Sequence, residues 1–396
     1  MSRPGPRTIG VVTFSRAEYS ACRPVIEAIQ AEDDLALHLL VSGTHLAAEF
    51  GSTIEAIEAD GFVIADRIEM LDPNDTPAGT GRSIGRAVIG LAESFARSRP
   101  DILLLAGDRL ELLAVAAAAY PFGLPLAHLS GGEITQGAYD DQVRHALTKL
   151  SHLHFVAHEQ ASRRLIQMGE EGWRVHTTGE PALDLIGRTE LMERRELARF
   201  LGMDLSPPVV VVTQHPTTLS GQVATIEVDQ LLATLDCLAA TIIFTSPNAD
   251  PGGRAIAKRL QDFASTRPRA AFFASLGQRR YWSLLAIADL MVGNSSSGIW
   301  EAPSFELPAV NIGRRQDGRL RAANVIDAAP ESKAILAAIE RGLDPAFKAS
   351  LAGLVNPYGD GSAALCIVGV LKQLELGMKL LQKRFVDRPE VSLLDP

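Results

Sequence analysis

Acidic side chains recur between residues 108 and 141, in three short segments that follow hydrophobic runs. The segments are AGDRLE (106–111), SGGE (130–133) and DDQVRH (140–145). An isolated aspartate at the start of a helix is usually an N-cap, but capping does not require carboxylates after successive hydrophobic runs. Paired carboxylates are suited to moving protons to and from a substrate. The pattern predicts an acid–base site made of Asp108, Glu133, Asp140 and Asp141.

Two arginines lie among these carboxylates. Arg109 follows Asp108, and Arg144 lies one helical turn after Asp141 in the helix-like stretch DDQVRHALTKL. An aspartate and an arginine at this spacing commonly form a surface ion pair. Because the carboxylates are gathered nearby, we instead expect Arg109 and Arg144 to contact a substrate.

Residue types that bind phosphate cluster in GNSSSGIWE (293–301), at the end of another hydrophobic run. A strand that continues into a helix through several serines brings hydroxyl groups together with first-turn N–H groups. An acidic residue further along can accept the two hydroxyls of a ribose, and GRRQ (313–316) supplies guanidinium groups. The pattern predicts a nucleoside diphosphate site with these members: Ser295, Ser296, Ser297, Gly298, Glu301 and Arg315.

Four more polar residues follow hydrophobic runs. Arg16 and Ser20 lie in SRAEYS (15–20), His215 lies in TQHPTT (213–218) and Asn248 ends SPN (246–248). A first-turn arginine is often only solvated, and a lone histidine is more often structural than functional. Their positions after predicted strands favour binding roles. We expect Arg16 and Ser20 to contact a diphosphate or nucleotide, Asn248 to contact substrate, and His215 to bind phosphate or act as an acid.

Short hydrophobic runs that alternate with helical patterns must position these residues. The runs are apolar on both faces, which is typical of buried parallel strands, and the intervening stretches are long enough for crossover helices. The alternation restarts near residue 209, after Ser206-Pro207-Pro208, a segment that is either a hinge or a loop entering a strand. The fold class is therefore α/β, with two Rossmann-like doubly wound domains. Ligands bind beyond the carboxyl ends of such strands, so we expect the two sheets to face a shared cleft.

Composition narrows the class of function. The 396 residues carry a formal net charge of -9, so the basic footprint of a nucleic-acid-binding protein is missing. The beginning of the chain lacks the apolar run of a signal peptide, and no run of eighteen apolar residues occurs. The three cysteines, Cys22, Cys237 and Cys366, are far apart, which favours reduced thiols in a cytoplasm. We expect no membrane partner, no cofactor and no required metal.

Seven motifs, in order, resemble the UDP-N-acetylglucosamine 2-epimerase family, and most closely its hydrolysing branch of sialic and legionaminic acid pathways. They are SRAEYS, AGDRLE, SGGE followed by DDQVRHALTKLSHLHFV, TQHPTT, GNSSSGIWEAPSF, NIGRRQ and NPYGDG. The similarity runs from about residue 8 to about residue 375. It implies a glycosyltransferase-B-like fold with three parts: an N-terminal acid–base domain (1–185), a UDP-binding domain (186–372), and a C-terminal helix and tail (373–396) that packs back on the first domain. It also implies a homodimer.

The resemblance implies a reaction in which UDP leaves C1 of a UDP-sugar as the C2 proton is removed, giving a glycal. The hydrolysing branch then adds water and releases a free manno-configured amino sugar and UDP. The substrate would be UDP-N-acetylglucosamine or a UDP-2,4-diacetamido-trideoxyhexose. By position, Asp108 and Asp140 or Asp141 would be acid–base residues, with His215 near the diphosphate.

One position departs from the wider family. Non-hydrolysing relatives carry a catalytic glutamate where this chain has Ser130, and here only Glu133 lies nearby. Either Asp108 and the Asp140/Asp141 pair share the proton chemistry, or Glu133 has taken it over. Three alternatives stay open: a non-hydrolysing epimerase, a glycosyltransferase on the same fold, and a nucleotide-sugar-binding protein with impaired catalysis.

Overall fold

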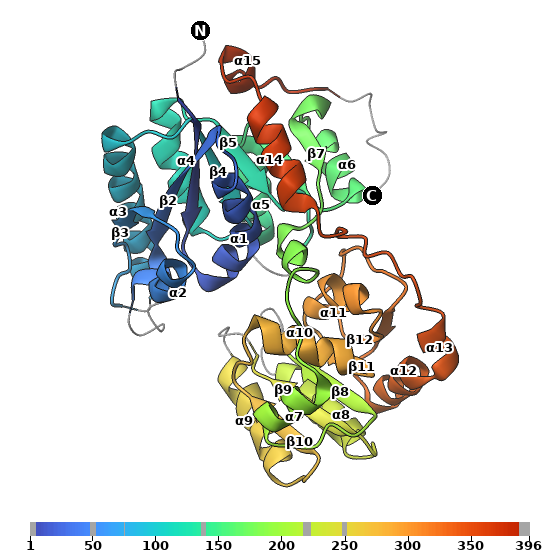
Figure 1. Cartoon of the computed structure of the whole chain (residues 1–396). Helices are drawn as coiled ribbons and strands as arrows, with labels where there is room; N and C mark the ends of the chain where they lie inside the picture. The colour runs from blue at the N-terminus through green and yellow to red at the C-terminus, as the bar shows by residue number, and fades with distance from the viewer. Residues whose placement is uncertain are drawn as a thin grey trace, which may run out of the picture. The chain divides into compact units, whose positions relative to one another are not determined.

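The computed structural model describes residues 5–47, 53–74, 76–135, 140–216, 223–247 and 252–387. Contacts divide the chain into two compact units (Figure 1). The first unit comprises residues 1–133, 139–185 and 358–396, and the second comprises residues 134–138 and 186–357.

The first unit is built on a seven-stranded sheet in which all pairings are parallel, in the order β3-β2-β1-β4-β5-β6-β7. Its strands are β1 (Arg7–Thr13), β2 (Leu35–Ser42), β3 (Ile64–Ile68), β4 (Ile102–Ala106), β5 (Leu126–Leu129), β6 (Leu153–Val156) and β7 (Val175–Thr177). The strand order reverses between β1 and β4. In open α/β sheets this switch point is where ligands bind.

Helices cover both faces of this sheet. They are α1 (Arg16–Gln30), α2 (Ile54–Ala59), α3 (Pro77–Arg97), α4 (Glu111–Ala119), α5 (Asp140–Leu150), α6 (Glu159–Gln167), α14 (Ala363–Gln373) and α15 (Met378–Leu381), with short 3-10 turns η1 (Gly43–Leu46), η3 (Tyr120–Phe122), η4 (Gly172–Arg174) and η5 (Pro181–Leu185). Alternate residues of β4 enter two different cores: Ile102 and Leu104 pack with α1 and α14, while Leu103 and Leu105 pack with α3 and α4. This two-sided burial explains the continuous apolar runs.

The chain returns to the first unit at Tyr358, earlier than the expected boundary at 373. Tyr358 is buried, and its carbonyl accepts a hydrogen bond of 2.6 Å from the Glu180 N–H. Asp184 then caps α14 by accepting from the N–H groups of Ala363 (3.0 Å) and Ala364 (2.7 Å). Figure 1 shows α14 lying beside α1, far from it in sequence. The helix therefore belongs to the first unit because its cap and its apolar face both come from that unit.

The segment after α14 is anchored to the same unit by two cations. Arg174, which is fully buried, donates to the carbonyls of His152 (2.9 Å) and Leu380 (2.7 Å). Lys383 donates to the Ser151 carbonyl (2.5 Å), directly after the last residue of α5, and lies 2.8 Å from the Glu170 carboxylate. The described part of the expected tail thus caps the carboxyl end of α5.

The second unit contains a six-stranded parallel sheet in the order β10-β9-β8-β11-β12-β13. Its strands are β8 (Val209–Thr213), β9 (Thr241–Thr245), β10 (Ala270–Phe273), β11 (Leu290–Gly293), β12 (Ala309–Ile312) and β13 (Val325–Ala328). Its helices are α7 (Arg194–Leu201), α8 (Val223–Leu235), α9 (Gly253–Ser265), α10 (Gln278–Ile287), α11 (Ser297–Trp300), α12 (Ser332–Leu343) and α13 (Pro345–Ala349), with the 3-10 turn η6 (Ala302–Phe305). Here the order reverses between β8 and β11.

The Pro207-Pro208 segment lies inside the second unit, because that unit already begins at Ile186. It is a loop that enters β8 and not a hinge between the units. In the ranges that the structure covers, none of the helices combines the length and apolar character needed to span a bilayer.

Candidate active site

Arg144 gathers three of the predicted acid–base residues at the carboxyl ends of β4 and β5. It lies on α5, its side chain is 4% exposed, and its guanidinium pairs with the Asp108 carboxylate. The same guanidinium donates to the Glu133 carbonyl (2.8 Å) and lies 3.5 Å from Asp141 Oδ1. Asp108 keeps 29% of its side chain exposed, so this carboxylate is held from one side and open on the other. These contacts suit a positioning role for Arg144.

Glu133 and His158 form a second, buried part of the site. Glu133 follows β5 and His158 is the N-cap of α6; His158 Nε2 lies 2.8 Å from Glu133 Oε1. His158 Nδ1 accepts from the Ala161 N–H (3.1 Å), so in the neutral ring the proton is on Nε2, facing Glu133. The sequence analysis did not select His158, since a histidine at a helix start has no spacing that singles it out.

Arg109 lies in a separate acidic environment near the end of β1. It donates twice to Glu111, at 2.6 and 3.2 Å, and the neighbouring charges of Glu111, Glu18 and Asp140 raise its pKa against the opposing effect of burial. Asp140 therefore influences Arg109, whereas Asp141 contacts Arg144. The two aspartates of the DDQVRH segment thus have different partners.

Glu18 is a buried carboxyl group that the sequence analysis missed. Its Oε2 accepts from the Phe14 N–H and the Ser15 hydroxyl, both at 3.1 Å. Burial raises the pKa of Glu18 to about 7, an effect that the positive charge of Arg109 opposes. The Ser15-x-x-Glu18 spacing is that of a capping box, which is a signal that could have found it. Near this turn, Arg16 is exposed and Ser20 is half-buried on α1.

Asn294 ties together the strand ends of the second unit. Its side chain accepts from the His215 N–H (2.7 Å) and donates to the His215 carbonyl (2.9 Å), joining the ends of β8 and β11. Its carbonyl accepts from Arg315 (3.2 Å) and Gln316 (2.8 Å), which follow β12. The predicted residues His215 and Arg315 are thereby brought to the same edge of the sheet as the serine segment, at the β8/β11 switch point.

The three serines of that segment are not equivalent. Ser297 is buried and accepts from the Tyr281 hydroxyl (2.8 Å), whereas Ser295 and Ser296 are partly exposed. The helix that follows, α11, has only four residues. A helix of four residues has only a weak dipole, so the groups at this segment with the chemistry to hold an anion are the individual O–H and N–H donors and the Arg315 guanidinium.

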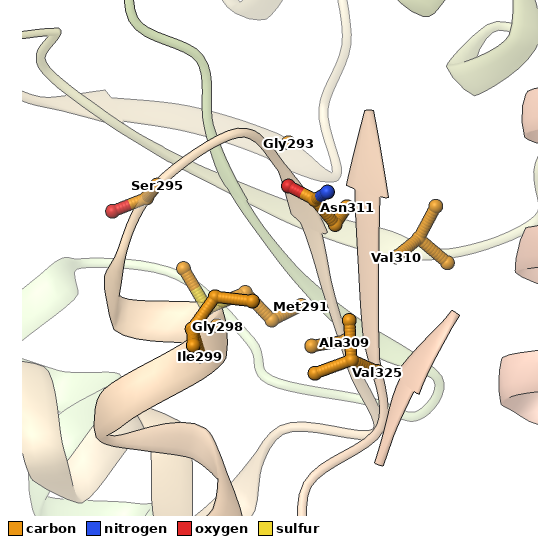
Figure 2. Close-up of a pocket in the computed structure, with 9 residues that line it drawn as sticks. All are labelled: Met291, Gly293, Ser295, Gly298, Ile299, Ala309, Val310, Asn311 and Val325. Carbon is orange, nitrogen blue, oxygen red and sulfur yellow. The ribbon is translucent and has the colours of Figure 1, made fainter. Parts of the chain in front are cut away.

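A small cavity lies behind this segment, lined by residues of β11, β12, β13 and α11 (Figure 2). Gly298 borders it, and a Cβ at Gly298 would lie 3.3 Å from the Ala309 Cβ. In Figure 2 the Ser295 side chain points away from the cavity. Gly298 therefore allows close packing of α11 on the sheet, while Ser295 lines the cavity at its other end.

Glu301 is held by an indole. It lies after α11 and accepts a hydrogen bond of 2.5 Å from Trp282 Nε1 of α10, and burial raises its pKa. Asn248 lies outside the described residues. Among the residues that are described, His, Cys, Asp and Glu side chains do not form a group of three or more that could hold a metal ion.

Comparison with known proteins identifies the family. The model of the family described as UDP-N-acetylglucosamine 2-epimerase matches residues 27–372. The chain is 41% identical to the GDP/UDP-N,N'-diacetylbacillosamine 2-epimerase (hydrolyzing) of Campylobacter jejuni, over 81% of this chain and 84% of that protein. It is 36% identical to the UDP-N,N'-diacetylbacillosamine 2-epimerase (hydrolyzing) of Legionella pneumophila, over 95% and 98%.

The fold is shared with solved structures at lower identity. The UDP-GlcNAc 2-epimerase of Neisseria meningitidis bound to UDP-GlcNAc superimposes with a TM-score of 0.79 at 18% identity, over 93% of this chain and 100% of that chain. The enzyme of Methanocaldococcus jannaschii in complex with UDP-GlcNAc and UDP gives 0.76 at 17% identity, over 92% and 99%. The predicted pair of Rossmann-like domains is confirmed, and the chain belongs to the UDP-N-acetylglucosamine 2-epimerase family.

Proposed function

We propose that the protein is a hydrolysing 2-epimerase that converts a UDP-linked N-acetylated amino sugar into a free manno-configured sugar and UDP. The observation that carries the proposal is that Arg144 joins the carboxylates of Asp108 and Asp141 to the backbone carbonyl of Glu133, near the carboxyl ends of the central strands of the first unit. The names of the relatives at 41% and 36% identity support hydrolysis, and they favour UDP-N,N'-diacetylbacillosamine as the substrate.

The chemistry requires the leaving group to drive proton removal. The C2 proton is not next to a carbonyl, so it is a weak acid. A base takes that proton, the C2–H electron pair forms the C1=C2 double bond, and the C1–O bond breaks with its electrons leaving on UDP. Donors that stabilise the charge developing on the diphosphate therefore lower the barrier. Ser295, Ser296, Arg315 and His215 are the candidates in the second unit.

The carboxylates of the first unit would perform the proton transfers. Asp108 is held by Arg144 and is partly exposed, which suits a group that must reach a substrate atom. Glu133 is 2% exposed and pairs with His158, which suits a group that relays or stores a proton. Water then adds its oxygen to C1 and gives up a proton to a base. A proton is delivered to C2 on the face of the glycal opposite to the one from which the original C2 proton left, which inverts C2.

The nucleotide would be held mainly by the second unit. Glu301, fixed by Trp282, would accept the ribose hydroxyls, and Ser295 with Arg315 would bind the diphosphate. Arg16 and Ser20 would add contacts from the first unit. We propose that the free sugar is a precursor of sialic or legionaminic acid. We also propose that the protein is a homodimer in the cytoplasm.

The test is turnover in deuterated water, with UDP-N,N'-diacetylbacillosamine and UDP-N-acetylglucosamine as separate substrates. We expect a free manno-configured sugar with deuterium at C2 and one UDP per sugar, formed faster from the diacetylated substrate. Recovery of an intact UDP-manno-configured sugar would support the non-hydrolysing alternative. Faster turnover of UDP-N-acetylglucosamine would overturn the substrate assignment.

The Asp108→Asn variant separates chemistry from binding. It should lose turnover at least about a thousandfold, since a general base contributes about 10²–10⁴-fold, while UDP still binds as measured by calorimetry. Near-wild-type turnover in this variant would remove Asp108 from the mechanism.

A further inference from the structure

Glu180 is a buried carboxyl group that lies next to Ser130 and that the proposed reaction does not use. It follows β7, it is 3% exposed, and its Oε2 accepts a hydrogen bond of 2.9 Å from the Ser130 hydroxyl. Fifty residues of sequence separate the two groups. The fold thus brings an acidic group from the end of β7 next to Ser130 at the end of β5.

Ser130 is held in an unusual backbone conformation. Its φ is 61°, in the left-handed region that residues other than glycine, asparagine and aspartate rarely adopt. Its N–H donates to the Phe155 carbonyl of β6 (2.9 Å), and its side chain is anchored by Glu180. A strained residue persists when its surroundings determine its geometry, and such residues are frequent at active sites. Here the determining contacts are β6 on one side and Glu180 on the other.

The backbone of Glu180 is itself fixed. Its N–H donates to the Tyr358 carbonyl (2.6 Å), and the Tyr358 ring lies edge-on to the His158 ring with centroids 5.2 Å apart. A Cβ on Gly179 would lie 3.2 Å from the Gly359 Cα, so the two chain segments are in close backbone contact. The NPYGDG motif therefore holds Glu180 and His158 in one packed arrangement.

We propose, resting on the function proposed above, that Glu180 is a positioning residue of the proton-transfer site: held by Ser130 and Tyr358, it keeps Glu133 and His158 in one geometry. We do not assign Glu180 a contact with the substrate, because its side chain is buried. Its action on the reaction passes through Ser130 and through its electrostatic coupling to Glu133.

The charges that face Glu180 come from several elements. Glu133 after β5 and Asp184 in η5 both raise its pKa, the Ser130 hydroxyl lowers it, and burial is the largest effect, giving a value of about 7. Cys22 of α1 also interacts with Glu180, and burial keeps that thiol neutral by raising its pKa far above its usual range. His158 contacts one of these acids directly, since its Nε2 lies 2.8 Å from Glu133 Oε1. Below pH 7 Glu180 is mainly neutral, and above pH 7 it becomes negatively charged.

The experiment compares Glu180→Gln and Ser130→Ala with the wild-type full-length protein. We measure kcat and KM from pH 5.5 to 9, UDP affinity and thermal stability. Glu180→Gln keeps the shape but cannot ionise, so kcat should fall about tenfold with KM and UDP affinity within twofold, and the limb of the kcat profile near pH 7 should disappear. Ser130→Ala removes a hydrogen bond that favours the charged form, so the same limb should move to higher pH.

The matched control is Glu170→Gln. Glu170 is another fully buried carboxylate of the same unit, paired with His154 (3.0 Å) and Lys383 (2.8 Å) near the C-terminal segment. It should lower the melting temperature and leave kcat and its pH profile unchanged. A Glu180→Gln protein that behaves like this control, with an unaltered pH profile, would overturn the proposal and leave Glu180 a structural acid.

A second measurement does not depend on turnover. The ring signals of His158, followed by NMR on histidine-labelled protein at one fixed pH and assigned with a His158→Asn variant, should change their chemical shifts in Glu180→Gln and stay unchanged in Glu170→Gln, because Glu180 holds the Tyr358 segment that packs on the His158 ring. Unchanged His158 signals in Glu180→Gln would also overturn the proposal. If the wild-type protein releases no UDP from either sugar nucleotide, the proposed function fails, and the His158 signals still decide whether Glu180 positions this site.

Discussion

Replacing Arg144 with methionine removes the cation that gathers the acid–base residues. Arg144 is buried and contacts the Asp108 carboxylate, the Glu133 carbonyl and Asp141. A hydrogen bond to a charged group contributes about 1.5–3 kcal/mol, and breaking a buried ion pair costs about 3–5 kcal/mol. Because Asp108 remains partly exposed and water can solvate it, we expect the low end, about 3 kcal/mol. For a domain of this size that lowers the melting temperature by roughly 6–12 °C.

The Arg144 substitution should lower kcat even at temperatures where the variant protein is fully folded. With Arg144→Met, kcat should fall about a hundredfold, since misplacing a catalytic group by about 1 Å has that effect. Arg144→Lys keeps the charge but lacks the planar fork that spans Asp108 and the Glu133 carbonyl, so its kcat should fall about tenfold. UDP affinity should change less than twofold in both variants.

Arg174→Met is the control for this prediction. Arg174 is similarly buried in the same unit and also pairs with a carboxylate, that of Glu171 (2.7 Å), besides the backbone carbonyls of His152 and Leu380, but none of the predicted site residues is among these partners. It should lose comparable stability and keep wild-type kcat, with thermal melts and steady-state kinetics measured at a temperature where each variant is folded. If Arg144→Met keeps kcat within twofold while its melting temperature falls as in Arg174→Met, Arg144 only stabilises the fold and our assignment is refuted.

Three further outcomes are expected. Between pH 4.5 and about 7 native Glu18 keeps a proton that the unfolded chain releases, so wild-type stability falls relative to Glu18→Gln as pH rises, by about 3 kcal/mol; equal differences in urea unfolding at pH 4.5 and 7.5 would contradict this. Trp282→Phe removes the donor to Glu301 and should weaken UDP binding about tenfold by calorimetry; unchanged affinity would disconnect this pair from the nucleotide. Gly293→Ala should yield no soluble protein, because φ is +134° and the new Cβ would lie 2.0 Å from the Thr213 carbonyl oxygen; a folded variant of normal stability would refute that packing argument.

Most strands could be predicted because they are buried on both faces. Two strands, β3 and β13, lack a continuous hydrophobic run, and both lie at sheet edges. The residues of β3, IADRI, alternate between half-buried and exposed positions before a final buried one, so they form no continuous apolar run. Strand β13, VIDA, has only one fully buried residue. Edge strands have one unpaired side and tolerate charge, and in β3 and β13 the charged residues interrupt the hydrophobic run.

The candidate site was only partly predictable, for a different reason. Asp108 and Glu133 stand out because carboxylates recur after successive hydrophobic runs, which capping alone does not require. Glu180 and His158 do not stand out, because their roles depend on residues that are distant in sequence. Glu180 contacts Ser130, and His158 contacts Glu133. No local spacing encodes such a contact.

The sequence by itself determined the number of parallel-sheet domains, the kinds of side chain at their strand ends, and the family, because hydrophobic period and ordered motifs are local properties. Only the tertiary structure decided which groups pair: Arg144 with Asp108, Glu133 with His158, and Glu180 with Ser130. Protonation belongs to the same category, because the pKa of a carboxyl group depends on its burial and on charges a few ångströms away. The fold sets both of these quantities.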